Sequence, residues 1–314
     1  FMMNSQLILS VSALICSVVF LKSFQFFFLK NNMIDEIKIR SSHKTIATRS
    51  GGIAIFVSIF FVSLFYYISS NVIYDFSFLV PLSLLLFIGL YDDIYKLDFK
   101  LKFIFQIIAA KIIIDNGLII DNLHGVFGIY ELNRIIGQLI TIFFVVAIIN
   151  AINFIDGIDG LAISSVALFI ILFELLSSMD SIFINFSIIV VSTFLPLYYF
   201  NFKKKNKIFL GDSGSLFLGG VVSIYVLHIL SQNYIIKDAF DIHKILFVIS
   251  VLFYPIIDII RVVILRIYNN KSPFIADKNH IHHLLNQKTE NHFFSVLIII
   301  ATSIIVFSSI HLIL

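Results

Sequence analysis

The sequence has little charge and almost no cysteine. Aspartate, glutamate, lysine and arginine make up 13% of the 314 residues, whereas 59% of the residues are hydrophobic. So little charge excludes an ordinary soluble globular enzyme. The single cysteine, Cys16, excludes a disulfide within the chain. Because there are only four prolines and thirteen glycines and no low-complexity linker, we expect one transmembrane domain over residues 1–314.

Several familiar motifs are also missing. The sequence contains neither a Walker phosphate-binding loop nor the glycine-rich fingerprint of a Rossmann fold, so we do not expect a nucleotide-binding fold. No basic stretch precedes the first apolar run and no small-residue cleavage site follows it, so we expect this run to stay as a helix. The net charge of +3 is modest, and we expect no nucleic-acid partner.

What the sequence does contain is apolar runs long enough to cross the roughly 30 Å hydrocarbon core of a bilayer as helices. The fourth run is short and carries Gln106 and Lys111. We expect an all-α, polytopic integral membrane protein with about ten transmembrane helices. They are placed at residues 5–29, 52–70, 76–92, 100–116, 136–155, 160–178, 182–200, 214–231, 244–268 and 293–313.

The basic residues are distributed unevenly between the two sides of this arrangement. Sixteen of the 22 lysines and arginines fall in one set of alternate loops and three fall in the other. By the positive-inside rule the first set is cytoplasmic, which places both termini outside. All five unusual polar clusters also fall in the cytoplasmic set, and this predicts an active site at the cytoplasmic face. They are SHKTIATRSGG (42–52), GLYDDIYKL (89–97), NAINFIDGIDG (150–160), FLGDSGS (209–215) and ADKNHIHHLL (276–285).

Carboxylates at helix ends are the first candidates for chemistry. Asp92 and Asp93 end a predicted helix, where the helix dipole is already negative, so they favour a nearby cation; a solvated helix end is the alternative. Their side chains point about 100° apart, so one can face a ligand while the other orients a neighbour. Asp156 is placed like them, and Asn153 one turn earlier can add an amide oxygen. Such oxygens suit Mg²⁺.

Two further aspartates have a structural alternative. We expect the helix before Gly157 to end there in a left-handed C-cap, and Asp159 then fits the N-cap of the next helix as well as it fits a catalytic role. Asp212 can likewise be an N-cap. Alternatively it can hold a metal while the free amides of the helix start face a phosphate.

Histidines and other basic residues complete the candidate site. His280, His282 and His283 are too closely spaced for the usual structural zinc site and no cysteine assists them. Near phosphates they can instead neutralise charge in the transition state, together with the basic residues His43, Lys44 and Arg49. Lys96, Lys100 and Lys102 can contact phosphates or lipid headgroups, or simply set the topology. Asp258 and Arg261, spaced i, i+3, are expected to form a structural pair.

Together these clusters indicate metal-assisted phosphoryl transfer. In this order, the DD pair followed by Leu97, NAINFIDGIDGLA, GDSGSLFLG and HIHH resemble the polyprenyl-phosphate N-acetylhexosamine-1-phosphate transferase superfamily. SPFIADKNHIHHLL is similar to the branch that begins O-antigen, enterobacterial common antigen and teichoic-acid linkage synthesis. The sister branch, phospho-MurNAc-pentapeptide translocase, usually has three consecutive histidines and is the alternative. Thr48 stands where the family often has a proline.

The resemblance implies a reaction and its participants. UDP-N-acetylhexosamine, most often UDP-GlcNAc, and undecaprenyl phosphate give a polyprenyl-diphospho-sugar and UMP, at the cytoplasmic face of the bacterial inner membrane. The cofactor would be Mg²⁺, or Mn²⁺ in its place, and the partners would be membrane lipid and a second copy in a homodimer. The resemblance assigns Asp212 and Asn153 to the metal, Asp92, Asp93, Asp156 and Asp159 to catalysis, and His43, Lys44, Arg49, Lys102, Asn150, His280, His282 and His283 to substrate binding.

Three other classes fit the residues less well. Ten spans with intramembrane charges also fit a secondary transporter, although transporters place their polar residues near the membrane midplane rather than at one face. A prenyl synthase with a DDxxD motif would need an aspartate where Lys96 stands. A structural scaffold would not need five polar clusters on one side.

Overall fold

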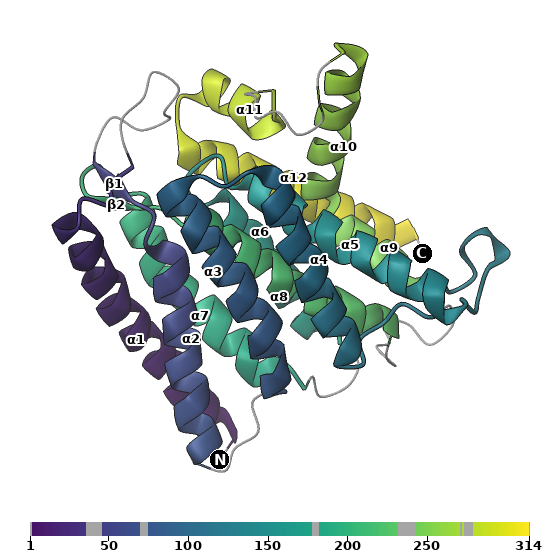
Figure 1. Cartoon of the computed structure of the whole chain (residues 1–314), viewed down its shortest axis with the longest axis horizontal. Helices are drawn as coiled ribbons and strands as arrows, with labels where there is room; N and C mark the ends of the chain where they lie inside the picture. The colour runs from purple at the N-terminus through teal and green to yellow at the C-terminus, as the bar shows by residue number, and fades with distance from the viewer. Residues whose placement is uncertain are drawn as a thin grey trace. The chain divides into compact units, whose positions relative to one another are not determined.

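The computed structural model describes residues 2–35, 46–69, 75–177, 182–231, 243–270, 272 and 279–313, and these are mostly helical (Figure 1). Each of the ten predicted apolar runs forms helix, and a short amphipathic helix before the last of them was not predicted. The helices are α1 (Met2–Lys30), α2 (Gly51–Ile68), α3 (Leu79–Tyr95), α4 (Phe99–Asp115), α5 (Arg134–Ile155), α6 (Leu161–Leu176), α7 (Ile184–Asn201), α8 (Gly211–Ser231), α9 (His243–Val251), α10 (Phe253–Tyr268), α11 (Ile281–Thr289) and α12 (His292–Ile313), with 3-10 turns η1 (Phe76–Phe78) and η2 (Val126–Gly128).

The length and apolarity of the helices identify a polytopic, all-α membrane protein. Among the described residues, seven helices are long and apolar enough to cross a membrane, or eight if α9 and α10 together form one span. Helices α4 and α6 are shorter, with 17 and 16 residues. Lys100 and Lys102 lie in the first turn of α4, and an ion pair joins Lys111 and Asp115 near its end.

The predicted continuous run over residues 244–268 is wrong in one respect, because the chain bends by 73° between α9 and α10. Pro255 provides the physical reason. Proline has no N–H to donate to the carbonyl of Val251, four residues earlier, so a helix cannot continue through it undisturbed. In the structure Pro255 occupies the first turn of a new helix, where no such hydrogen bond is needed.

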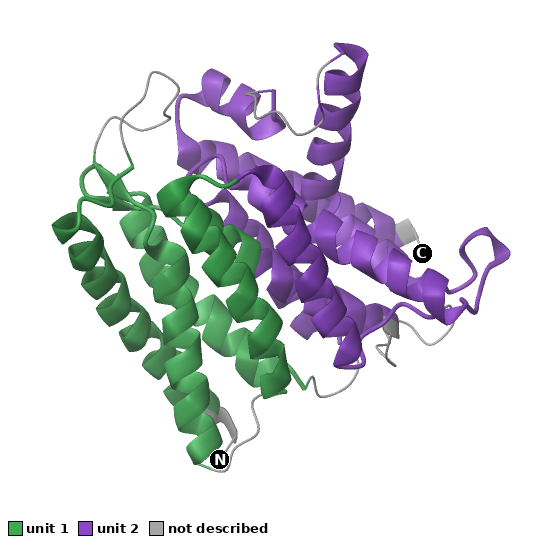
Figure 2. Cartoon of the chain, in the orientation of Figure 1, with its two compact units in different colours: residues 1–97, 180–217 green, residues 98–179, 218–314 purple. Residues whose placement is uncertain are grey.

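The chain divides into two units, coloured separately in Figure 2, and the boundary falls inside α8. In unit 1 (residues 1–97 and 180–217), α1 packs along both α2 and α7. Ser17 on α1 donates a 2.9 Å hydrogen bond to the carbonyl of Thr193 on α7. The two-residue strands β1 (Ala47–Thr48) and β2 (Lys207–Ile208) pair in parallel, with Ala47 opposite Lys207. This pairing brings the chain segments before α2 and before α8 together.

In unit 2 (residues 98–179 and 218–314), α5 packs against α4, α6 and α10, and α12 packs against α6, α9 and α11. Fully buried aromatic rings fill its interior: the Phe173 and Tyr225 rings meet edge to face with their centroids 5.0 Å apart. Such contacts stabilise a core beyond the area they bury. The polar clusters of this unit lie at the ends of α5, α6, α10 and α11.

Candidate active site

The first candidate cluster, here the aspartate cluster, consists of Arg49, Asp92, Asp93 and Asp212 in unit 1. Its centre is the Asp93 carboxylate, whose side chain is 1% exposed. Asp93 Oδ1 accepts a 3.0 Å hydrogen bond from the backbone N–H of Asp212, and Oδ2 accepts one of 3.0 Å from that of Ser213. The first amides of a helix have no partner inside it. A carboxylate at this end is also attracted by the positive end of the helix dipole. Asp93 therefore caps α8.

This arrangement corrects both predictions for the start of α8. Asp212 is not its N-cap, because the helix begins at Gly211 and Asp212 lies inside the first turn. The backbone amides of Asp212 and Ser213 are not available to bind a phosphate, because both already donate hydrogen bonds to Asp93. The half-buried Asp212 thus lies in the first turn of α8, beside the cap that Asp93 provides.

Two glycines allow the backbone of α8 to come this close. A methyl group at Gly89 of α3 would collide with the backbone of Asp212, and one at Gly52 of α2 would collide with the backbone of Gly214. Small residues permit such close helix contacts in membrane proteins. The glycines of the GLYDDIYKL and SHKTIATRSGG clusters therefore determine how near Asp212 lies to Asp93.

Arg49 supplies the positive charge of the aspartate cluster. Its Nη1 lies 3.4 Å from Asp93 Oδ1 and its Nη2 lies 3.0 Å from Asp35 Oδ1. Burial of the guanidinium lowers the pKa of Arg49, but the carboxylates of Asp35, Asp93 and Asp212 raise it by more, so the net shift is upward. Arg49 is therefore always a cation here.

Asp92 and Asp93 point in different directions, as adjacent helical residues should. Asp92 Oδ1 accepts a 2.6 Å hydrogen bond from the N–H of Leu97, just beyond the end of α3. Lys96, the residue before Leu97, has a φ of 56°, and this left-handed conformation turns the chain sharply. Asp92 thus shapes the turn after α3, while Asp93 orients the start of α8.

The second cluster, in unit 2, is the loop between α5 and α6. Helix α5 ends at Ile155, with Asp156 as its C-cap. The left-handed residue is Gly160 with φ 81°, not the predicted Gly157, and Gly160 rather than Asp159 is the N-cap of α6. The carboxylate of Asp159 is buried, and its Oδ2 lies 2.9 Å from Nδ1 of His292. The predicted capping role of Asp159 is therefore wrong.

His292, at the start of α12, was missed by the sequence analysis. It stands alone at the edge of an apolar run, nine residues after the histidine motif, and nothing in its sequence context links it to Asp159. Its side chain is 15% exposed. The pairing of these two residues fastens the loop before α6 to the start of α12.

The two predicted asparagines lie one turn apart near the end of α5. Asn150 donates a 2.7 Å hydrogen bond to the side-chain oxygen of Gln106 on α4, and another of 2.8 Å to the carbonyl of Val146. Asn153, one turn later, is half-buried, and its carbonyl accepts a 3.3 Å hydrogen bond from the N–H of Asp156. Asn150 thus joins two helices, and Asn153 and Asp156 lie beside the loop.

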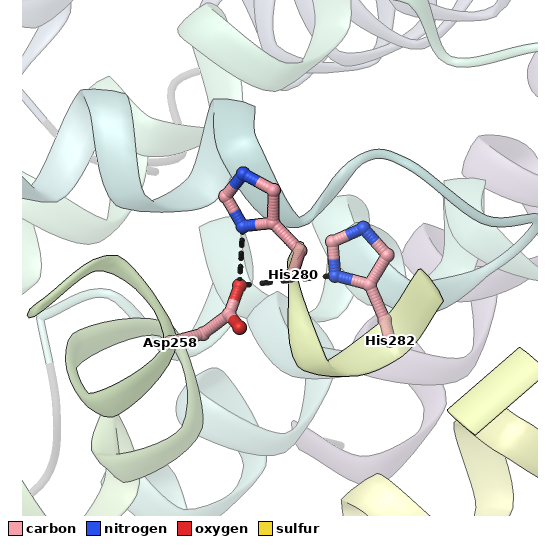
Figure 3. A group of neighbouring side chains, drawn as sticks. All are labelled: Asp258, His280 and His282. Atoms are coloured by element: carbon pink, nitrogen blue, oxygen red, sulfur yellow. Dashed lines mark hydrogen bonds and ion pairs between the residues drawn. The ribbon is translucent and has the colours of Figure 1, made fainter. Parts of the chain in front are cut away.

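The third group surrounds the histidine motif, where α10 and the start of α11 meet in unit 2. His280 Nδ1 lies 2.6 Å from Asp258 Oδ2, and Asp258 Oδ1 accepts a 2.7 Å hydrogen bond from the N–H of Ile281. His282 Nδ1 lies 3.9 Å from Asp258 Oδ2. Figure 3 shows both imidazole rings turning one nitrogen toward this carboxylate. All three side chains are buried.

The predicted pairing of Asp258 with Arg261 is not what these residues do. Arg261 donates a 2.6 Å hydrogen bond to the carbonyl of Asn279, while Asp258 binds His280 and Ile281. Both side chains project from α10 and hold the same segment of chain. The i, i+3 spacing therefore lets both side chains bind the segment from Asn279 to Ile281 and does not produce an ion pair between them.

Asp258, His280 and His282 could in principle reach one metal ion, since one ligand atom from each lies within 4.8 Å of the others. The contacts favour hydrogen bonding. The 2.6 Å separation of Asp258 Oδ2 and His280 Nδ1 is a hydrogen-bond distance, and the Arg266 guanidinium lies 3.4 Å from His280 Nε2, where it opposes a second cation. This agrees with the sequence argument against structural zinc.

The remaining predicted substrate-binding residues are distributed as follows. His43 and Lys44 lie outside the described residues. Lys102 is half-buried in the first turn of α4. His283 is half-buried beside His282, with their ring centroids 4.3 Å apart. Within each unit the structure thus brings some of the predicted residues together. Asp93 contacts Arg49 and the backbone of Asp212 in unit 1, and the rings of His280 and His283 both lie beside that of His282 in unit 2.

Comparison with known proteins gives these clusters a family. Residues 75–230, which include three of the five, match the model of glycosyl transferase family 4. A probable undecaprenyl-phosphate N-acetylglucosaminyl 1-phosphate transferase of Bacillus subtilis is 32% identical over 279 residues, which cover 86% of this chain and 74% of that protein. A decaprenyl-phosphate N-acetylglucosaminephosphotransferase of Mycobacterium leprae is 32% identical over 284 residues, which cover 83% of this chain and 71% of that protein.

A more distant relative belongs to the same group. The undecaprenyl-phosphate alpha-N-acetylglucosaminyl 1-phosphate transferase of Yersinia pestis is 29% identical over 286 residues, which cover 85% of this chain and 74% of that protein. These similarities extend well beyond any single motif. The chain belongs to the polyprenyl-phosphate N-acetylhexosamine-1-phosphate transferase superfamily, as the resemblance of its motifs predicted.

Proposed function

We propose that the protein transfers an N-acetylhexosamine-1-phosphate, in the first place GlcNAc-1-phosphate, from a UDP-sugar to undecaprenyl or another polyprenyl phosphate and releases UMP. The observation that carries this proposal is the similarity, over more than four fifths of the chain, to relatives named for this sugar phosphate and for polyprenyl phosphates. The reaction would be the first membrane step of a cell-surface polysaccharide, such as O-antigen, common antigen or a teichoic-acid linkage.

The chemistry requires charge stabilisation more than a strong base. An oxygen of the lipid phosphate attacks the phosphorus bonded to the sugar, and UMP leaves. Because the second pKa of a phosphate monoester is about 6, the nucleophile is already mostly a dianion at neutral pH. The geometry of Asp93 agrees, since both its oxygens already accept backbone hydrogen bonds. Asp93 therefore acts as a positioning residue, not as the base.

Magnesium, with manganese as a substitute, is the proposed cofactor. Asp212 is its leading ligand among the residues of unit 1, and Asn153 is the proposed ligand of unit 2. Carboxylate and amide oxygens suit this hard cation. Asp212 is half-buried and therefore partly exposed to solvent. When bound, the ion neutralises developing charge on the phosphates. Arg49 would add a permanent positive charge beside the Asp212 carboxylate.

The distribution of basic residues supports a proposal for the orientation in the membrane. We propose that both termini are outside, that the active site is at the cytoplasmic face of a bacterial inner membrane, and that about ten segments cross. The sixteen lysines and arginines in one set of loops, against three in the other, support this orientation. A count of ten requires α9 and α10 together to form one span and both α4 and α6 to cross. Their lengths correspond to about 24 to 26 Å of helix.

The test uses purified protein, undecaprenyl phosphate and a panel of UDP-sugars, with UMP release and mass spectrometry of the lipid product as readouts. Wild-type protein should form a polyprenyl-diphospho-sugar, most rapidly from UDP-GlcNAc. EDTA should stop the reaction and added Mg²⁺ should restore it. Uptake of the sugar nucleotide into vesicles without a lipid product would instead indicate a transporter.

The matched variants are Asp212→Asn and Asp121→Asn. Asp212→Asn keeps the shape of the side chain but removes its charge, so we expect UMP release to fall by at least about 100-fold, the size of a lost electrostatic contact in a transition state. Asp121 lies exposed in the loop before α5, and its variant should behave as wild type. Near-normal turnover of Asp212→Asn at saturating Mg²⁺ would remove this residue from the mechanism.

A further inference from the structure

Helix α10 carries two side chains, one turn apart, that hold the histidine motif. Asp258 contacts His280 as described above, and the hydroxyl of Tyr254 lies 3.0 Å from Nδ1 of His282. Residues i and i+4 lie on the same face of a helix. Tyr254 and Asp258 therefore act on neighbouring histidines from a single helix face, and all four side chains are buried.

Both ring nitrogens of His280 are occupied inside the protein. Its Nδ1 donates to the Asp258 carboxylate, which can only accept, and its Nε2 then accepts from Arg266, whose Nη2 lies 3.4 Å away. His280 is thus held in one tautomer between the Asp258 carboxylate and the Arg266 guanidinium. Its side chain serves to fix the start of α11.

His282 differs because one of its ring nitrogens has no hydrogen-bond partner among the described residues. This nitrogen is Nε2, and it is buried. It lies against the loop between α5 and α6, where a methyl group at Gly157 would collide with it. A buried polar group without a partner costs about 1 to 3 kcal/mol, so such groups call for a ligand or a functional role.

Tyr254 determines which nitrogen of His282 carries the proton. A phenol is a good donor and a poor acceptor, whereas an unprotonated imidazole nitrogen is a good acceptor, so the Tyr254 hydroxyl donates to Nδ1. The proton of the neutral ring is then on Nε2. Burial, and then the neighbouring His283, His280 and His292, lower the pKa of His282 to about 2, which keeps the ring neutral.

We propose that Tyr254 is a positioning residue that holds His282 as the Nε2–H tautomer, and that this N–H is donated beside Gly157 to an acceptor oxygen of the bound sugar nucleotide. This inference rests on the proposed function and deepens it. It divides the histidine motif into His280, which holds the fold, and His282, which faces the ligand. It also adds Tyr254, which no motif of the sequence indicated.

Two substitutions of His282 separate a ligand contact from a structural one. His282→Gln places an amide N–H near the former Nε2, whereas His282→Asn reaches only the position of Nδ1. If Nε2–H binds the substrate, the glutamine variant should keep the KM for UDP-sugar within about threefold of wild type, and the asparagine variant should raise it at least tenfold. The reverse order would show that the bond to Tyr254 is what matters.

Tyr254→Phe tests the positioning role, with Tyr268→Phe on the same helix as the control. Tyr268 is 83% exposed, and its variant should resemble wild type. Tyr254→Phe should raise the KM for UDP-sugar about tenfold, the effect of about 1.4 kcal/mol, and leave the KM for polyprenyl phosphate unchanged. An unchanged KM for UDP-sugar, or an equal rise in both KM values, would overturn the proposal.

A readout independent of activity keeps the two proposals distinct. In protein labelled with ¹⁵N-histidine, NMR should show His282, assigned through the His282→Gln variant, protonated on Nε2 only. This signature should be lost in Tyr254→Phe. A proton on Nδ1 in wild type would overturn the inference even if transfer occurs. If wild type transfers no sugar phosphate but shows the expected tautomer lost in Tyr254→Phe, the proposed function fails and the positioning by Tyr254 stands.

Discussion

At the residue scale, Asp93 receives hydrogen bonds from two backbone amides of α8 and lies beside the guanidinium of Arg49. A carboxylate is the one common side chain that can accept on both oxygens without offering a proton of its own. This explains why an acid, and not an amide, is needed at a buried site close to a second carboxylate. The charge of Asp93 is matched by Arg49 and by the helix start.

Asp93→Asn should therefore damage the fold as well as activity. The new NH₂ group must face a backbone N–H of Asp212 or Ser213, which leaves a buried donor unpaired at a cost of about 1 to 3 kcal/mol. We expect a lower thermal unfolding temperature in detergent together with reduced UMP release. Asp92→Asn, on the half-buried neighbour, should cost less.

The relation between the two measurements is the informative result. If Asp93→Asn kept the unfolding temperature of wild type but lost turnover, Asp93 would act on the substrate and not as a cap. Asp92→Asn supplies the reference for the loss of a carboxylate charge alone, because its amide oxygen can still accept the hydrogen bond from the N–H of Leu97.

At the element scale, two helices begin at aspartates that belong to other helices. Asp93 of α3 caps α8, and Asp258 of α10 accepts the first N–H of α11. In both cases the capping residue is far away in the sequence. The apolar runs predicted where the chain forms helices, because length and hydropathy are local properties. The caps assigned to Asp159 and Asp212 were wrong, because a local pattern does not reveal a partner from another helix.

The same limit applies to the candidate site. The polar clusters were recognisable because ionisable residues within or at the very end of an apolar run are costly and unusual. The structure brings Asp93 and the backbone of Asp212 together, as a shared role requires. Tyr254 and His292 could not be recognised. A tyrosine in an apolar run and a histidine at its edge are common, and only the packing of α10 and α12 gives them partners.

The contact of α3 with the start of α8 should be sensitive to a single methyl group. Gly89→Ala places that methyl against the backbone of Asp212, which cannot move aside as a side chain can. Overpacking of this kind costs about 1 to 3 kcal/mol, and we expect both a lower unfolding temperature and slower UMP release. Ser83→Ala, on the same helix, is the control, since the Ser83 hydroxyl donates its hydrogen bond to the carbonyl of Val80 within α3.

A normal unfolding temperature and normal turnover for Gly89→Ala would mean that α3 and α8 can separate without consequence. The Asp93 cap would then tolerate a displaced helix. That result would also weaken the proposed positioning of Asp212.

At the scale of the whole molecule, the scarcity of cysteine makes the orientation measurable. Cys16→Ser removes the single thiol. A cysteine introduced into one loop then shows on which side of the membrane that loop lies. In this background Lys204→Cys should react with a membrane-impermeant maleimide in inside-out vesicles, and Glu131→Cys should react in right-side-out vesicles. Both positions are exposed. Labelling of both from the same side would contradict the orientation derived from the basic residues.

The cap on α8 also has a consequence for the biogenesis of the protein. Its donor amides follow Asp93 by 119 and 120 residues, so four more helices are synthesised and inserted between α3 and the start of α8. Until α8 arrives, Asp93 has no amides to bind and Arg49 must neutralise it. A nascent chain that stops before α8 therefore lacks both backbone hydrogen bonds to this buried carboxylate, so unit 1 can complete its packing only after α8 has been made.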